Sequence, residues 1–105
     1  MSELPVYIKP INLDLPLHDF VKEHGLNVAR NILDGAPAKA TLFVYAYVAK
    51  SIDYLRIDEE GNWHVFIMTK GFWRPITSAQ LIKSFNDIAF AMQQLKVAVN
   101  GVHHE

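Results

Sequence analysis

Two short apolar runs separated by a turn constrain this chain more than any other feature of its sequence. Residues 53–58 and 63–69 have the composition of β-strands, and Glu59-Glu60-Gly61-Asn62 between them has the chemistry of a tight turn. A strand that is buried on both faces needs a layer on each side, so the hairpin must pack on helices or on further strands. Both faces of the second run are apolar, with Trp63, Val65 and Ile67 on one and Phe66 and Met68 on the other.

Amphipathic helical patterns lie on either side of the hairpin. The first predicts a helix from Asp14 or Pro16 to about Leu33 with Gly35 as its C-cap, although Gly25 within the pattern disfavours it. The second begins at a capping-box pattern over residues 77–80 and predicts a helix to about Val99, before Asn100-Gly101. The core stripe of this last helix comprises Leu81, Phe85, Ile88, Met92, Leu95 and Val99.

The segment 36–52 carries two conflicting signals. Pro37 at a first helical position and the five alanines that follow position 35 favour a helix, whereas its aromatic and β-branched residues favour a strand. We expect a helix here, and the sequence leaves the strand open. The residues expected to point inward are Leu42, Tyr45, Ala49 and Ile52.

These elements together predict an α+β fold. We expect one small domain over residues 1–105, with two or three helices packed on an antiparallel β-hairpin or small sheet. Three prolines in residues 1–16 predict an extended lead-in, in which Val6-Tyr7-Ile8 has the composition of a short edge strand. Residues 101–105 are expected to form a short tail.

Composition and charge narrow the function classes. The formal net charge of −1 disfavours a duplex-DNA binder, which usually carries a basic excess. The absence of cysteine excludes disulfides and sulfur-ligated metal sites and fits a reducing compartment. The first residues lack the pattern of a signal peptide, and the longest apolar stretch, residues 40–49, is too short to cross a bilayer. We therefore expect a cytoplasmic protein that does not bind a membrane.

Catalytic and cofactor motifs are missing from the sequence. It has no glycine-rich phosphate loop, no nucleophile elbow and no paired zinc-ligand spacing, so we expect no catalytic residue, no metal and no cofactor. His24 lies on the apolar stripe of the first helix and is expected to be a core histidine, while His64 is expected at the surface or in an interface. Asp58, Glu59 and Glu60 are interpreted as a solvated turn.

Two features indicate a binding surface. Lys70, Phe72, Trp73 and Arg74 follow the hairpin in an expected loop, and Trp and Arg are enriched at the energetic centres of interfaces. The alternative is that Phe72 and Trp73 fill the core beneath that loop. Phe90 and Val97 lie away from the core stripe of the last helix and are expected on a self-association face, unless they pack within the monomer.

The leading functional hypothesis is a non-catalytic interaction protein that binds another protein or forms a homodimer. Its length, lone domain and lack of cofactor motifs resemble those of bacterial and phage accessory proteins, which modulate a partner. A second hypothesis is single-stranded nucleic-acid binding, with Phe72 and Trp73 stacking on bases and Lys70, Arg74 and Lys83 contacting phosphates. A third is a small enzyme that uses His24 or His64 as a general base.

Overall fold

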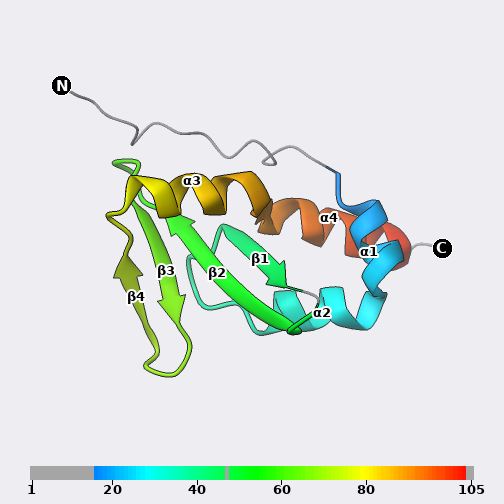
Figure 1. Cartoon of the computed structure of the whole chain (residues 1–105). Coiled ribbons are helices and arrows are strands. Elements are labelled where there is room, and N and C mark those ends of the chain that lie inside the picture. Colours follow the sequence, from blue (N-terminus) through cyan, green and yellow to red (C-terminus); the bar gives the residue numbers. More distant parts are fainter. Residues whose placement is uncertain (1–15, 47, 104–105) are drawn as a thin grey trace.

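The computed structural model describes residues 16–46 and 48–103, which form an antiparallel sheet with helices on both faces (Figure 1). Every strand pair is antiparallel, and the order across the sheet is β4-β3-β2-β1-β5. The α+β class and the antiparallel sheet that the sequence predicts are confirmed. In chain order the elements are α1 (His18–His24), α2 (Leu26–Asp34), β1 (Leu42–Ala46), β2 (Ser51–Ile57), β3 (Trp63–Ile67), β4 (Phe72–Pro75), α3 (Ala79–Ile88), β5 (Phe90–Ala91) and α4 (Met92–His103).

The alternation of side chains along the strands divides the core into two layers. Phe43 and Tyr54 are cross-strand partners on one face, called the α4 face here, which packs on α1, α2 and α4. Leu42 and Leu55 occupy the opposite face, called the α3 face, where α3 contributes Ile82 and Phe85. Figure 1 shows α1, α2 and α4 gathered beside β1, while the β3–β4 hairpin extends away from them. The sheet therefore has the layer on each side that the hairpin sequence requires.

The expected first helix is two helices, because Gly25 interrupts it. Gly25 has a φ of 99°, which a right-handed helix does not allow and which a residue with a side chain rarely adopts. Its N–H still donates to the Val21 carbonyl and closes α1, while its own carbonyl accepts from the Ala29 N–H at the start of α2. Gly35 follows α2 as expected. The expected lead-in, including the strand at residues 6–8, lies outside the described residues except for Pro16.

The helix expected over residues 36–52 is wrong, since this segment forms β1 and the start of β2. Leu42, Phe43 and Val44 are consecutive and all buried, and only a strand between two layers buries neighbours that point in opposite directions. Tyr45 is half-buried, whereas Ala49 is exposed in the connection to β2. The alanines that favoured a helix therefore lie largely in the connections, whereas Phe43, Val44 and Tyr45 lie in β1.

The expected loop over residues 70–75 contains a fourth strand, β4, which pairs with β3 in the register Phe66↔Trp73 and Ile67↔Phe72. The turn before it is made at Gly71, where φ is 74°. The N–H groups of Lys70 and Gly71 both donate to the Ile67 carbonyl, at 3.1 and 2.7 Å. Only residues 68–71 connect the two strands, so the hairpin sequence continues into a three-stranded meander.

The expected last helix is divided by an extended segment at Ala89 and the two residues of β5. Ala89 has ψ 146°, and the Met92 N–H donates to the Thr41 carbonyl at 2.9 Å instead of continuing the helix. The break changes the face that α3 presents to the core, so the expected core residues Leu81 and Ile88 are 44% and 51% exposed. The N-cap is Ser78, whose hydroxyl accepts from the Leu81 N–H, and α4 continues through Gly101.

Candidate functional site

The β3–β4 hairpin and the start of α3 present an apolar surface on the α3 face of the sheet. Phe72 lies across from Ile67 in the strand pair, so both side chains point to the same side. Phe72 is 49% exposed and Leu81, in the first turn of α3, is 44% exposed. Ile67 and Leu81 line a hollow of about 280 Å³ together with Val65 and Arg74. We call Ile67, Phe72 and Leu81 the hairpin patch.

The tip of the hairpin exposes a further apolar side chain. Met68 follows the last residue of β3 and is 57% exposed. Three of the six large hydrophobic residues that are exposed in the described part of the chain, Met68, Phe72 and Leu81, therefore belong to the hairpin or to the helix beside it. A single exposed apolar residue is common in soluble proteins, but several exposed on one hairpin and on the helix beside it are typical of a binding surface.

Trp73 lies on the opposite face of the sheet from Phe72. Its ring centroid is 5.2 Å from that of Phe66 at an interplanar angle of 71°, and the Arg56 guanidinium carbon is 5.8 Å from its ring centroid. Trp73 is half-buried and packs against the core of the α4 face. The sequence motif Phe72-Trp73-Arg74 is thus divided, with Phe72 and Arg74 on the α3 face and Trp73 on the other.

Lys70 and Arg74 provide positive charge beside the hairpin patch. Both side chains are exposed, and neither forms an ion pair with another residue in the described ranges. Arg74 lines the same hollow as Ile67 and Leu81. Two unpaired cations next to an apolar surface favour a ligand that is apolar with acidic groups near it.

The outer edge of β4 offers few hydrogen-bonding groups to an added strand. The Ile76 N–H donates to the Trp63 carbonyl at 2.8 Å, which makes this a hydrogen-bonded pair. Hydrogen-bonded and non-hydrogen-bonded pairs alternate along an antiparallel ladder. The N–H of residue 73 and the backbone of residue 75 therefore point away from β3. Residue 75 is Pro75, which has no N–H to offer. A partner would therefore bind mainly through side chains and only weakly through strand addition.

Phe90 and Val97, the expected self-association face, do not lie on one helix. Phe90 belongs to β5 and is half-buried, with its ring centroid 5.7 Å from that of Phe20 and 5.7 Å from that of Phe43. Val97 belongs to α4 and is 46% exposed. Aromatic residues of the same chain therefore contact Phe90, and Val97 is left as a single exposed apolar residue.

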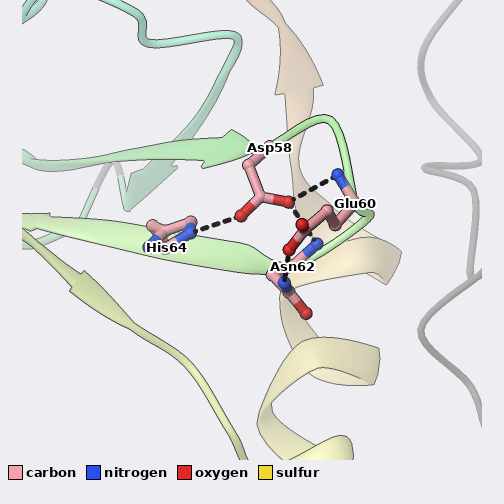
Figure 2. Close-up of polar contacts among 4 residues, drawn as sticks. All are labelled: Asp58, Glu60, Asn62 and His64. Carbon is pink, nitrogen blue, oxygen red and sulfur yellow. Dashed lines mark hydrogen bonds and ion pairs between the residues drawn. The ribbon is translucent and has the colours of Figure 1, made fainter.

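The acidic turn between β2 and β3 is held together by Asp58 (Figure 2). Its Oδ1 accepts from the backbone N–H groups of Glu60 and Asn62, both at 2.9 Å, and its Oδ2 lies 3.2 Å from His64 Nε2. The backbone hydrogen bond from Asn62, followed by the contact with His64, lowers the pKa of Asp58 to about 2. The turn is thus a structural unit and not only a solvated loop.

The Asp58–His64 pair has no nucleophile as a cross-strand neighbour. The residues directly across from His64 are Arg56 on β2 and Pro75 on β4. His24, the other candidate base, is half-buried and its ring packs 4.6 Å from Phe20 and 5.1 Å from Tyr45, centroid to centroid. The strand pairing therefore places no Ser or Thr directly across from His64.

Sequence reasoning assigned Leu81 to the core and Ile67 to a buried strand face, so it missed two members of the hairpin patch. A signal for Leu81 existed, because Ile82, Phe85 and Ala89 form a second apolar stripe at helical spacing, and these are the residues that pack on the α3 face.

Three further findings bear on function. Within residues 16–46 and 48–103, no three His, Asp or Glu side chains are grouped closely enough to hold a metal ion. In the same ranges no helix has the length and apolar character needed to cross a bilayer. Comparison with protein-family models, with curated proteins and with solved structures finds no match to this chain.

Proposed function

We propose that this protein is a non-catalytic interaction module that binds a partner protein through the hairpin patch. The observation that carries the proposal is the exposure of Phe72 and Leu81 beside the hollow that Ile67 and Leu81 line. Large apolar side chains around a concave surface supply most of the energy in protein interfaces, and flanking polar residues supply specificity. We further propose a cytoplasmic location, supported by the absence of cysteine, and a role as a bacterial or phage accessory protein.

A protein partner fits the site better than single-stranded nucleic acid. Base stacking requires an open aromatic face, but Arg56 lies over the ring of Trp73 and Phe66 packs against it at a steep angle. The net charge of −1 gives no excess of cations for phosphate contacts. The exposed Phe72 lies on the other face from Trp73, so the two rings do not form one stacking platform.

The partner surface is expected to be apolar at its centre with carboxylates at its rim. The apolar centre matches Phe72 and Leu81, and the carboxylates match Lys70 and Arg74, which are exposed and unpaired among the described residues. Pro75 makes strand addition at the β4 edge unfavourable. We therefore expect recognition by side chains, in a complex that one or two apolar substitutions weaken strongly.

The test uses a double variant, Phe72→Ser with Leu81→Ser, and a matched control, Val97→Ser. Val97 is 46% exposed, close to the exposure of Leu81, but lies on α4. Tagged wild type and both variants are purified from nuclease-treated native lysate, and the affinity for any stoichiometric protein is then measured with purified components. Loss of two interface anchors of at least about 2 kcal/mol each corresponds to a loss of affinity of more than about 100-fold.

The proposal predicts that the double variant loses the partner while the Val97 control retains it and both remain folded. Equal binding by wild type and the double variant would show that the hairpin patch is not the interface. Recovery of nucleic acid alone, lost after nuclease treatment, would favour the single-stranded nucleic-acid hypothesis instead. A concentration-dependent dimer of wild type that becomes monomeric in the double variant would identify the partner as a second copy.

A further inference from the structure

A second hollow lies at the opposite end of the sheet, between α1 and the α4 face of β1 and β5. Its volume is about 280 Å³, just below the range of about 300–1,000 Å³ that is common for small-molecule sites. Phe20 and His24 of α1 form one wall, and Tyr45 and Phe90 form the other. We call this hollow the aromatic pocket. It contains none of the residues of the hairpin patch, so an inference about it does not rest on the proposed function.

The four rings are close enough for one bound group to contact several of them. The ring centroid of Phe20 is 4.6 Å from that of His24, 5.8 Å from that of Tyr45 and 5.7 Å from that of Phe90. The rings meet at angles between 54° and 74°, so they do not stack face to face on one another. A cation is attracted to an aromatic face within about 6 Å of its centroid. Phe20 is buried, whereas His24, Tyr45 and Phe90 are half-buried, so a cation in the hollow would contact mainly these three rings.

The charges around the aromatic pocket have one sign. Asp19 and Glu23 line it from α1, four residues apart and thus one helical turn above each other on the same side. Both are exposed, and neither forms an ion pair with another residue in the described ranges. Among the described residues, no lysine or arginine lines the pocket. Two carboxylates beside aromatic walls attract a positive charge and repel an anion.

We propose that the aromatic pocket binds a compact organic cation, specifically a quaternary or methylated ammonium group. Such a group presents methyl surface to the rings and a diffuse positive charge to the carboxylates, and its hydration is weak enough for it to leave water. An inorganic cation is a poorer match, because no set of three or more acidic or histidine side chains is gathered in the described residues to replace its water shell. The group belongs either to a free small molecule or to a methylated lysine of another protein.

The decisive experiment compares choline with 3,3-dimethylbutan-1-ol, which has the same shape and no charge. Both are titrated into isotopically labelled full-length protein, and the NMR signals of Phe20, Tyr45 and Phe90 are followed. We expect choline to shift these signals and to bind about tenfold more tightly than the neutral analogue. Equal affinity for the two compounds would show that the hollow binds apolar molecules without recognising charge. Signal shifts confined to other residues would show that binding occurs elsewhere. Either result would overturn the proposal.

The contribution of the carboxylates is tested with Asp19→Asn combined with Glu23→Gln. The matched control, Asp53→Asn combined with Glu59→Gln, changes the net charge equally at exposed positions that do not line the pocket. The first pair is expected to weaken choline binding several-fold and the control to leave it almost unchanged. An equal effect of both pairs would indicate attraction by net charge alone and would contradict the assigned site.

The two sources of the cation are separated with a short peptide that contains trimethyllysine, compared with the same peptide unmethylated. Tighter binding of the methylated peptide than of choline identifies a protein-borne group. Tighter binding of choline identifies a free small molecule. If neither probe binds, the proposal is wrong. None of these results depends on the hairpin patch, whose variant Phe72→Ser should bind choline as the wild type does.

Discussion

The hydroxyl of Tyr54 ties the sheet to the end of α2, and its removal gives a sharp test of the packing described above. The side chain is 2% exposed, and its hydroxyl donates to the Ile32 carbonyl at 2.6 Å. That carbonyl lies in the last turn of α2, where helix carbonyls lack partners of their own. Tyr54→Phe keeps the ring in the core and removes only this bond, so a buried acceptor is left unsatisfied at a cost of about 1–3 kcal/mol. For a domain of this size, each kcal/mol lowers Tm by about 4–8 °C.

The same substitution at Tyr45 provides the control, because Tyr45 is half-buried and its hydroxyl forms no hydrogen bond with the described residues. Thermal and urea unfolding at neutral pH should show a clear decrease in the free energy of unfolding for Tyr54→Phe and almost none for Tyr45→Phe. Burial also raises the pKa of Tyr54 above its ordinary value of 10.0. The neutral hydroxyl of Tyr54 therefore stabilises the fold fully below pH 10, and this stabilisation is lost as the pH rises further. The stability of Tyr54→Phe should not show this alkaline decrease. Equal stability of the two variants would refute the assigned role of this hydrogen bond.

Two further predictions concern the turn and the helix break. Asp58, whose pKa is lowered to about 2, stabilises the fold above its ordinary value of 3.8 and loses this contribution as pH falls toward 2, so Asp58→Asn should flatten the acid limb of the stability profile. An unchanged acid limb in urea titrations from pH 5 to about 2 would count against this role. Gly25→Ala should destabilise the fold by about 1–2 kcal/mol because φ is 99°, although a Cβ there meets no atom within 4 Å. Gly101→Ala, inside α4, should be neutral or stabilising in the same thermal unfolding assay.

The parts of the fold that could be predicted from sequence are those determined by neighbouring residues. The β2–β3 hairpin is an example, since Asp58 and Gly61 supply the turn and the runs on either side have the composition of strands. The first and last helices were located, but their interruptions were not, and the last helix continues to His103, past its expected end near Val99 and into the expected tail. Gly25 was visible as a weak point in the pattern, yet one glycine costs a helix only about 1 kcal/mol and does not decide between a break and a tolerated defect.

The elements that were missed depend on contacts distant in sequence. Residues 89–91 continue the apolar pattern of a helix, and the pairing of Phe90 with Phe43 on β1 is what makes them extended. Residues 42–46 lack the alternation of a half-exposed strand because both of their faces are covered. Parts of the candidate site were missed for the same reason. Phe72 and Arg74 could be singled out by residue type, whereas Leu81 was assigned to the core because the sequence offers two apolar stripes and the contacts with the sheet decide between them.

The position of the two-residue strand β5 affects how this molecule unfolds. Phe90 and Ala91 pair with the outer edge of β1, and the chain enters them from the layer on one face and leaves them into the layer on the other. The position of α3 in one hydrophobic layer and that of α4 in the other therefore both depend on the pairing of β5 with β1. Melting of β5 would release α3 and α4 together, so we expect both layers to unfold in a single cooperative step. The chain also cannot complete either layer until β1 is in place, which makes a long-range pairing an early requirement of its folding.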